Sequence, residues 1–530
     1  MARWECNLCS HIYDEETEGI KFEALPADWV CPVCGSPKAA FSMVINKEAE
    51  VNAEESIDVA TLSSYECSLC FHLYDEENEN VKWDDLPDDW VCPVCGSGKD
   101  AFKLKETKSQ ISSTTSSSDK VVEEYLSEWR RQSDDFESYM ADIHNMAING
   151  KSISEPMRTR LQTFNWDEIL IKGAQLSKLP LNKSQPVTTS TVIGPKAKIP
   201  LVIDSPITVT HMSFGALSLE AKLSLAKGSA KVKTAVCSGE GGIIPECLAA
   251  AHKYIFEYVP NKYSVTDENL KNVDAVEIKI GQSAKPGMGG HLPGHKVTAE
   301  IARLRGFREG EDITSPAHFP DIRTKDELKE TVDSLRQRTG GKPNGIKLAA
   351  GHLEADIEIA LYAGVDFITI DGRAGGTGSA PKMIKQAASI PTIFALARAR
   401  KFLDEKGADN ISLVITGGLR VSSDFIKALA MGADAIAIGT AAMMAVGCQQ
   451  YRICNTGKCS VGIATQDPVL RARLDVEKSS ERVANFFKVI TDELKDFARL
   501  TGNKDVHDLE MADLCTTNSE LSNYTGIDHV

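Results

Sequence analysis

The residues of this chain with the clearest capacity for metal chemistry are its cysteines, and most of them lie in groups. The chain has 530 residues and fourteen cysteines, which in a reducing compartment are better explained as metal ligands than as disulfides. Cys448, Cys454 and Cys459 lie close together, separated by five and then four residues. A structural zinc site or a four-iron cluster would use four such ligands, so a group of three needs another explanation.

Eight further cysteines belong to two copies of one small module. The stretch from WECNLC to VCPVCG returns 61 residues later as YECSLC to VCPVCG, without a gap. Modules of about 40 residues cannot bury enough apolar surface to fold alone, so four thiolates around one metal would supply much of the folding free energy. The pattern predicts two metal modules, at 1–46 with ligands Cys6, Cys9, Cys31 and Cys34 and at 62–106 with ligands Cys67, Cys70, Cys92 and Cys95.

Cysteine spacing alone does not separate iron from zinc, because both metals occupy tetrahedral sites made of sulfur. The aromatic residues add information, since they recur in both modules and predict a compact aromatic core: Tyr13, Trp29 and Phe41, then Tyr74, Trp90 and Phe102, with Trp4 or Tyr65 before the first ligand. Together with Leu-Pro-x-Asp-Trp-Val-Cys-Pro-x-Cys-Gly, this arrangement resembles rubredoxin over the whole of both modules. The resemblance implies one mononuclear iron in each, and zinc remains the alternative.

Charge and composition indicate an ordinary globular protein. The net charge is -16, which argues against nucleic acid or an anionic membrane as the main partner. No run reaches the roughly 18 apolar residues of a membrane span, and the start of the chain lacks the features of a signal peptide, so we expect a cytoplasmic location. Residues 107–120 are rich in serine and threonine, which predicts a flexible linker after the second module.

Beyond the linker, residues 121–199 have a helical pattern, and from about residue 200 short apolar runs alternate with helical stretches. Eight such units predict a parallel (β/α)₈ barrel over 200–500, followed by a C-terminal tail at 501–530. The expected strands are PITVTHMSF, KTAVCSG, AVEIKIG, DITSP, GIKLAAG, FITIDGR, SLVITGG and AIAIGT. In this fold the chemistry occurs at the carboxyl ends of the strands.

Polar and glycine-rich segments follow these expected strands. Gly417 and Gly418 follow the seventh strand and Gly439 and Thr440 the eighth, which with Arg420 is typical of a phosphate-bearing cofactor. A second group lies on or beside the strand ends and could hold a dicarboxylate substrate: Glu240, Lys279, Lys285, His291, Arg305 and Lys347.

These motifs together resemble the flavin domain of glutamate synthase, in the form found in archaea and anaerobic bacteria. The resemblance covers about residues 165–500 and includes HMSFGALS, SGEGG, EIKIGQSAKPGMGGHLPG, GIKLAAG, FITIDGRAGGTGSAP, TGGLR, AIGTAA and the cysteine segment 447–468. In that family three cysteines at this spacing hold a 3Fe-4S cluster, which would explain the missing fourth ligand. The alternatives are zinc with an outside ligand and a four-iron cluster completed by another group.

The same resemblance implies FMN in the barrel mouth. Its implied contacts are Ser213, Lys279, Gln282, Lys347, Asp371, Gly375, Gly376, Gly417, Gly418, Arg420, Gly439 and Thr440. Positions matching the 2-oxoglutarate contacts are Glu240, Lys285 and Arg305. The fourth is His291, where the better-known members carry glutamine, so that pH could tune carboxylate binding here.

The resemblance implies an enzyme that reduces 2-iminoglutarate, formed from 2-oxoglutarate and ammonia, to L-glutamate. Electrons would pass singly from the rubredoxin modules through the cluster to FMN, which can return a hydride. We expect an external electron donor for the modules, ammonia from solution or a separate glutaminase subunit, and assembly as a homo-oligomer or a multi-subunit enzyme. Two alternatives remain: a synthase that uses another amine, such as methylamine, and an electron-transfer hub without amino-acid chemistry.

Overall fold

The computed structural model describes residues 134–530 continuously and the region before them in part. In that region it describes residues 3–6, 12–15, 20–26, 29–32, 37–38, 41–44, 63–68, 72–75, 79, 81–87, 89–94 and 96–107. The expected linker lies outside the described residues except for Thr107, as do residues 121–133 of the expected helical segment. Among the described parts of the chain, no helix is long and apolar enough to cross a membrane.

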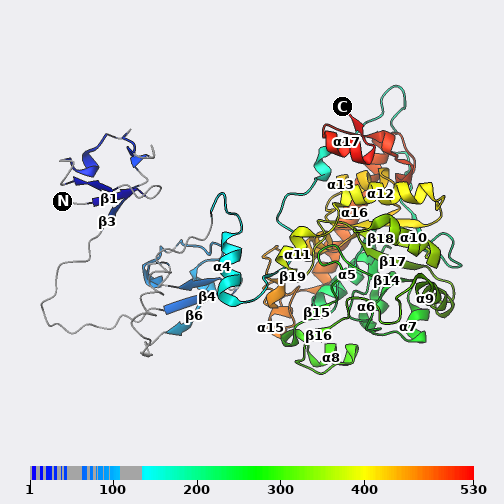
Figure 1. Cartoon of the computed structure of the whole chain (residues 1–530), viewed down its shortest axis with the longest axis horizontal. Helices are drawn as coiled ribbons and strands as arrows, with labels where there is room; N and C mark the ends of the chain where they lie inside the picture. Colours follow the sequence, from blue (N-terminus) through cyan, green and yellow to red (C-terminus); the bar gives the residue numbers. More distant parts are fainter. Residues whose placement is uncertain are drawn as a thin grey trace. The chain divides into compact units, whose positions relative to one another are not determined.

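Eight parallel strands form a closed barrel, which confirms the predicted fold class (Figure 1). Their order around the barrel follows the order along the chain, and the last strand pairs with the first. The strands are β11 (Ile207–Val209), β12 (Ala235–Cys237), β13 (Lys253–Tyr258), β14 (Ala275–Lys279), β17 (Asn344–Ala349), β18 (Phe367–Asp371), β20 (Ser412–Thr416) and β21 (Ala435–Ile438).

Helices cover the outside of the barrel, so its strands are buried on both faces and consist of near-continuous apolar runs, as in the FITID of β18. Several helices begin at a hydroxyl N-cap, such as Ser218 and Thr324. The helices are α5 (Leu219–Lys231), α6 (Pro245–Ala250), α7 (Asp267–Asn272), α8 (Ala299–Arg305), α9 (Lys325–Arg338), α10 (Leu353–Ala363), α11 (Lys382–Ala387), α12 (Thr392–Glu405), α13 (Ser422–Ala430), α14 (Thr440–Val446), α15 (Pro468–Arg471) and α16 (Val476–Leu500).

Seven of the eight expected strands belong to the barrel, and the structure differs from the expectation at one further barrel strand and at one expected strand. The third barrel strand is β13, whose sequence KYIFEY we did not predict as a strand. The stretch DITSP is not in the barrel, because its strand β16 (Ile313–Thr314) pairs only with β15 (His291–Leu292) in a separate antiparallel sheet. This small sheet lies in the long connection between β14 and β17, over residues 280–343.

The segments on either side of the barrel in sequence pair with each other. Strand β8 (Ile169–Ile171) pairs antiparallel with β22 (Leu514–Thr516), and β22 also pairs with β23 (Asp528–His529). Residues 501–530, expected as a tail, therefore form strands and the helix α17 (Ser519–Thr525), which contacts α12. Within residues 134–199, expected to be helical, the structure places one α-helix, α4 (Met140–Asn149), and otherwise short strands, one 3-10 turn and loops.

Each small module has a three-stranded antiparallel sheet. The first has the order β2-β1-β3, from β1 (Arg3–Cys6), β2 (Ile12–Asp14) and β3 (Phe41–Val44). The second has the order β5-β4-β6, from β4 (Ser63–Cys67), β5 (Leu73–Asp75) and β6 (Phe102–Thr107). Their aromatic residues form the compact cores that we predicted, with Phe22 and Trp83 as additional members. Trp4 stacks on Phe22 at 4.6 Å and Tyr65 on Trp83 at 4.5 Å between ring centroids.

Candidate functional site

A cavity opens at the carboxyl ends of the barrel strands, with an empty volume of about 1520 Å³ including its mouth. The structure brings together around this cavity all the residues that we predicted for substrate and FMN. They come from turns after five different barrel strands, from β14, β17 and β18 themselves, and from the long connection between β14 and β17. They are Ser213, Glu240, Lys279, Gln282, Lys285, His291, Arg305, Lys347, Asp371, Gly375, Gly376, Gly417, Gly418, Arg420, Gly439 and Thr440.

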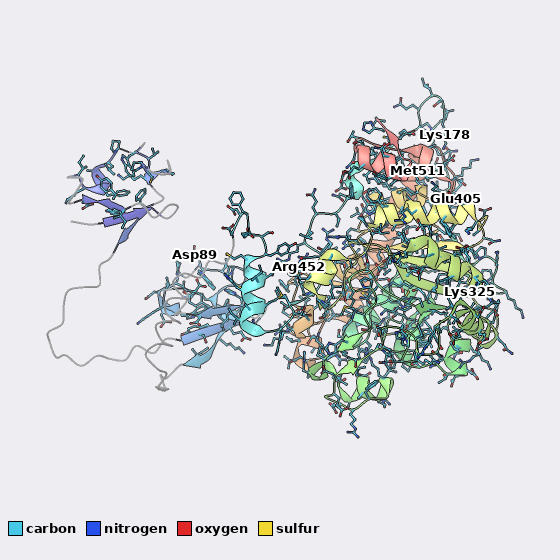
Figure 2. The ribbon with its side chains drawn as sticks, in the orientation of Figure 1. Asp89, Lys178, Lys325, Glu405, Arg452 and Met511 are labelled. Carbon is cyan, nitrogen blue, oxygen red and sulfur yellow. The ribbon has the colours of Figure 1, made fainter. Side chains whose placement is uncertain are left out.

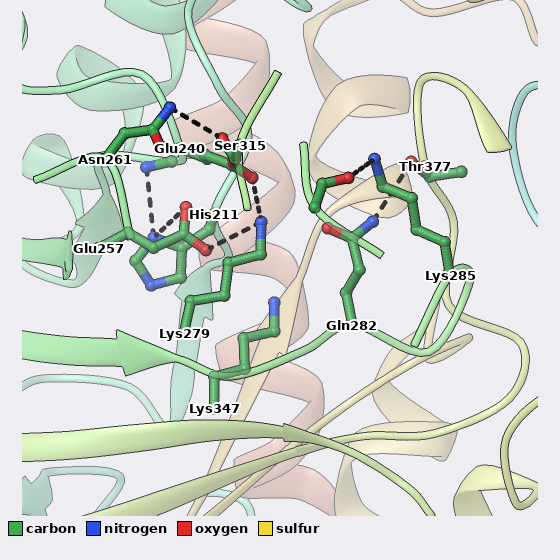
Figure 3. Close-up of polar contacts among 12 residues, drawn as sticks. His211, Glu240, Glu257, Asn261, Lys279, Gln282, Lys285, Ser315, Lys347 and Thr377 are labelled. Atoms are coloured by element: carbon green, nitrogen blue, oxygen red, sulfur yellow. Dashed lines mark hydrogen bonds and ion pairs between the residues drawn. The ribbon is translucent and has the colours of Figure 1, made fainter. Parts of the chain in front are cut away.

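An ion pair between Lys279 and Glu240 lies on one wall of the cavity (Figure 3). Lys279 Nζ also lies 3.8 Å from Glu257 Oε1, and the hydroxyl of Ser315 donates to Glu240 Oε1 at 2.6 Å. Burial would raise the pKa of Glu240, but Lys279, Ser315 and Lys285 lower it to about 2. Glu240 is therefore a fixed negative charge over the whole physiological range of pH.

Two cations of the long connection also reach the cavity. Lys285 donates from Nζ to the carbonyl oxygen of Gly289 at 3.2 Å, and its pKa is lowered by burial and by Lys279 nearby. Arg305 is only 9% exposed and donates from Nη2 to the carbonyl oxygen of Phe214 at 2.5 Å. Among the described residues, Arg305 Nε has no hydrogen-bond partner, although it is buried. A buried guanidinium with an unused donor is suited to an anionic ligand.

His291 lies at the rim of the cavity on β15. Its Nε2 is 2.8 Å from Asp312 Oδ2, and the two side chains are 51% and 64% exposed. The backbone N–H of Gly294 donates to the other oxygen of Asp312 at 2.6 Å. The hydrogen bond from His291 lowers the pKa of Asp312. His291 thus belongs to the mouth of the cavity and not to its interior.

A second group of buried polar residues lies beside the Lys279–Glu240 pair, because Lys347 on β17 is the strand-pairing partner of Lys279 on β14. Lys347 Nζ is 3.9 Å from Asp371 Oδ2, and Ser283 donates from its hydroxyl to Asp371 Oδ1 at 2.8 Å. Gln282 Nε2 lies 3.4 Å from the hydroxyl oxygen of Thr377, at the edge of a glycine-rich loop. This group offers an amide, a carboxylate and an ammonium group at fixed positions. Figure 3 shows Lys347 beside Lys279, and Gln282 beside Thr377.

Glycines and Arg420 make up the side of the cavity that is formed by the ends of β20 and β21. Gly417 and Gly418 have φ of +113° and +94°, a region that favours glycine, and a Cβ on Gly418 would come 2.5 Å from Ala374 Cβ. Burial and the neighbouring guanidinium of Arg158 lower the pKa of Arg420 to about 10. Two neighbouring guanidinium groups beside a bare glycine backbone fit a phosphate group.

Three buried acid–base residues were not predicted: His211, Glu257 and Glu277. His211 follows β11, Glu257 belongs to β13 and Glu277 to β14. His211 Nε2 lies 2.7 Å from Glu277 Oε2, an ion-pair distance without a well-directed N–H···O bond. His211 and Glu257 line the cavity. The available signal was a glutamate inside each of two largely apolar strands, KYIFEY and AVEIK.

The three cysteines of segment 447–468 are brought close together. Burial raises the pKa of both Cys448 and Cys454. The nearby thiol of Cys459 raises both pKa values further, and that of Cys454 reaches about 11. Gln450 approaches Cys448 Sγ with its amide Nε2 at 3.1 Å, and Cys454 lines the cavity. Among the described residues, no three cysteine, histidine or acidic groups lie close enough to hold one metal ion together.

On the same segment, Arg452, which is labelled in Figure 2, lies between the first two cysteines in sequence. It donates from Nη1 to the carbonyl oxygen of Arg158 at 3.3 Å. This contact joins the cysteine segment to the residues that precede the barrel.

Only part of the predicted metal sites in the small modules is described. Cys31, Cys67 and Cys92 are buried, at 2%, 0% and 1% exposure. Cys67 Sγ lies 3.3 Å from the hydroxyl oxygen of Ser97. Four of the remaining predicted ligands lie outside the described residues: Cys9, Cys34, Cys70 and Cys95. For Cys6 the structure describes the backbone but not the side chain.

Comparison with known proteins agrees with both parts of this architecture. The family model for the conserved region in glutamate synthase matches residues 139–504, and the rubredoxin model matches residues 3–41 and 64–102. The family match therefore covers the barrel and the cysteine segment, while the rubredoxin matches fall on the two small modules.

Several curated relatives share the larger domain. An archaeal glutamate synthase [NADPH] from Methanocaldococcus jannaschii is 42% identical over 349 residues, which are 65% of this chain and 66% of the relative. A glutamate synthase large subunit-like protein from Rhizobium meliloti is 35% identical over 74% of this chain and 93% of its own length. An archaeal-type glutamate synthase [NADPH] from Thermotoga maritima is 40% identical over 68% of this chain and 71% of the relative.

Among solved structures, a flavocytochrome b2 mutant matches 68% of this chain and 78% of its own, with a TM-score of 0.44 and 18% identity. The barrel assignment rests on the strand pairing of this chain and not on that score. From the family match, the chain belongs to the glutamate synthase family and has two rubredoxin modules before the domain of that family.

Proposed function

We propose that this protein makes L-glutamate by reducing 2-iminoglutarate, which forms from 2-oxoglutarate and ammonia in the barrel cavity. The observation that carries the proposal is the convergence of every residue predicted for substrate and FMN on that one cavity. The family match over residues 139–504 supports it. The overall reaction consumes one 2-oxoglutarate, one ammonium ion, two electrons and two protons, and yields glutamate and water.

The substrate side of the cavity has the charges that a dicarboxylate needs. We propose that Lys285 and Arg305 bind the two carboxylates, and the unused Nε donor of Arg305 supports this role. Glu240 stays ionised, so it is better suited to hold the ammonium or iminium nitrogen than a carboxylate. Fixing both ends of the substrate would present one face of its C2 carbon to the reductant, and orientation of this kind can lower a barrier by several kcal/mol.

We propose that FMN occupies the part of the cavity that reaches from Lys347 on β17 to the ends of β20 and β21. We propose that its phosphate lies against Gly417, Gly418, Gly439, Thr440 and the guanidinium of Arg420. Ser213, Lys279, Gln282, Lys347, Asp371, Gly375 and Gly376 would then surround the ring system. When bound, FMN supplies hydride transfer and accepts electrons one at a time. Within this arrangement Lys347 would stabilise negative charge beside the ring.

We propose that Cys448, Cys454 and Cys459 hold a 3Fe-4S cluster. The effect of neighbouring thiols on the pKa of Cys448 and of Cys454 indicates that the three cysteines lie near one another, which supports a shared ligand. Each rubredoxin module is proposed to hold one iron at its four cysteines. These groups, when bound, supply one-electron transfer, and an external donor would load the modules. Ammonia would come from solution or from a separate glutaminase subunit.

A turnover experiment tests the function directly. Protein purified without oxygen and reduced chemically is supplied with 2-oxoglutarate and, separately, with ammonia, glutamine or methylamine, and the amino acid formed is identified by mass spectrometry. Glutamate from ammonia is the expected result. N-methylglutamate from methylamine alone would assign the protein to the synthases of that product. Absence of any amino-acid product would leave only the electron-transfer hub.

A further inference from the structure

Glu257, His211 and Glu277 form a buried triad, with Glu257 on β13, Glu277 on β14 and His211 just after β11. The His211 ring lies between the two carboxylates, with Nε2 at 2.7 Å from Glu277 Oε2 and Nδ1 at 3.6 Å from Glu257 Oε2. Their side chains are 2 to 5% exposed. Figure 3 shows the imidazole of His211 beside Glu257. Glu257 is in turn near Lys279, which forms an ion pair with Glu240.

The Nδ1 atom of His211 has two competing neighbours. The backbone N–H of Gly239 donates to Nδ1 at 3.2 Å, which requires Nδ1 to be unprotonated. Glu257 Oε2 is also near, and among the described residues this buried oxygen has no hydrogen-bond partner. It would gain a donor only if Nδ1 carried a proton. Adding one proton to Nδ1 would therefore satisfy Glu257 and release the N–H of Gly239.

The charges around the ring favour that additional proton. Burial alone would lower the pKa of His211, but the thiol of Cys237 on β12 and the two carboxylates raise it to about 10. Among the described residues, His211 is the only cationic group within 4 Å of Glu277. The cations facing this region are Lys279 on β14, Lys347 on β17 and Lys222 on α5.

The ammonium group of Lys222 is hydrogen-bonded to backbone carbonyl oxygens. It donates from Nζ to the carbonyl oxygens of Met212, Cys237 and Ser238 at 2.8, 3.1 and 2.7 Å. Its pKa is lowered, because burial outweighs the nearby thiols and Glu257. Lys222 thus holds the ends of β11 and β12 together around the ring and does not form an ion pair with either carboxylate of the triad.

We propose that the Glu257–His211–Glu277 triad is the proton-holding group of this cavity: His211 carries its second proton at neutral pH, with Nδ1 turned from Gly239 to Glu257, and can release it during turnover and regain it from water. At a pH near the ring's own titration, negative charge that enters the cavity draws this proton onto Nδ1. The proposal rests on the proposed function, in which a dianion binds and each turnover consumes two protons that one-electron iron carriers do not bring. Gly239 precedes Glu240, so the proton on His211 would also determine how firmly the turn that carries Glu240 is held.

The first test observes the ring itself and needs neither substrate nor turnover. The protein is labelled with ¹⁵N-histidine, and the resonance of His211 is assigned as the one missing from His211→Gln. We expect that resonance to titrate well above the exposed His318, whose loss in His318→Gln identifies the reference signal. Glu257→Gln should lower the pKa of the His211 ring by about one unit or more, because one of its two carboxylates is neutralised. A ring that titrates near 6.5, or is unaffected by Glu257→Gln, would overturn the proposal.

The second test measures the linked proton. Binding of 2-oxoglutarate is followed by calorimetry at pH 9 to 10 in two buffers of different ionisation enthalpy, which gives the number of protons taken up. We expect proton uptake by the wild type and by His318→Gln, and its loss in His211→Gln, whose amide can still donate to Glu277. Undiminished uptake in His211→Gln would reject the triad while leaving the proposed function intact. Failure of the wild type to bind 2-oxoglutarate would contradict the proposed function, and the ring titration would still decide on the triad.

Discussion

Lys296 donates a hydrogen bond from Nζ to the carbonyl oxygen of Cys454 at 2.6 Å. Lys296 is 5% exposed and belongs to the long connection between β14 and β17, whereas Cys454 belongs to the segment after the last barrel strand. The contact therefore joins the cysteine segment to the connection that also supplies Lys285 and Arg305. Burial lowers the pKa of Lys296, and the thiols of Cys454 and Cys459 oppose that effect.

The first prediction concerns this lysine. Lys296→Met should lower the reduction potential of the proposed cluster, because it removes a cation and a hydrogen bond from the surroundings of its ligands. A loss of about 1 kcal/mol corresponds to a shift on the order of 40 mV for one electron. The measurement is a redox titration followed by EPR. Lys458→Met, which removes an exposed lysine from the same segment, should shift the potential less, and an equal shift in both variants would contradict the specific role of Lys296.

A second variant tests the cysteine assignment. Cys454→Ser should remove the cluster signal from low-temperature EPR and leave the signals of both rubredoxin irons. Cys515→Ser is the control, because Cys515 is a cysteine that lies on β22, outside the cysteine segment. An unchanged spectrum in Cys454→Ser would show that the three cysteines are not the ligands.

Arg305 offers a test of carboxylate binding. Arg305→Ala should raise the KM for 2-oxoglutarate by roughly 10- to 100-fold, the effect of losing a charged hydrogen bond worth about 1.5 to 3 kcal/mol. Arg303→Ala provides the control, since this exposed residue lies on the same helix, α8. Arg305→Lys, which keeps the charge, separates loss of binding from loss of packing against Tyr263. Wild-type kinetics in Arg305→Ala would exclude Arg305 from the site.

The lowered pKa of Lys285 gives a pH prediction. A lysine whose pKa is lowered loses its positive charge at a lower pH than a free lysine, so the KM for 2-oxoglutarate should rise with increasing pH before 10.5 is reached. Lys285→Arg should move that rise to higher pH, because a guanidinium keeps its charge. Steady-state kinetics between pH 7 and 10 measures both curves, and identical curves would exclude Lys285 as a substrate contact.

The glycine turn after β20 predicts flavin content. Gly418→Ala should lower the amount of FMN bound after purification, because the new Cβ would press on Ala374 in the turn proposed to hold the phosphate. Gly407→Ala is the control, as Gly407 also has positive φ but nothing within 4 Å of a new Cβ. It should retain FMN and cost only about 1 kcal/mol of stability. Equal FMN content in the two variants would place the phosphate elsewhere.

The barrel could be predicted from sequence because seven of its strands are short apolar runs followed by glycine or polar residues. Strand β13 ends in Tyr258 and continues into Val-Pro-Asn-Lys, so it lacks that signal. The two-residue strand β16 has the right composition, but its partner is a local strand in the same connection. Pairing between strands depends on three-dimensional neighbours, which an apolar run does not encode.

The cavity residues were predictable for a related reason. Strand ends of a parallel barrel meet on one face, so residues such as Lys285 and Gly418 could be grouped before the structure was known. The triad could not be predicted in this way, because Glu257 and Glu277 lie inside buried strands. The position of a residue along its strand does not reveal which side chain faces it from another strand. Only the closure of the barrel places His211 between them.

The pairing of β8 with β22 has a consequence for synthesis on the ribosome. The hydroxyl of Thr516 donates to the carbonyl oxygen of Glu168, a residue 348 positions earlier. At about 5 to 20 residues per second, the early strand would wait roughly 17 to 70 seconds for its late partner. During translation the apolar side chain of Ile169, fully buried in the finished protein, would remain uncovered and available to chaperones.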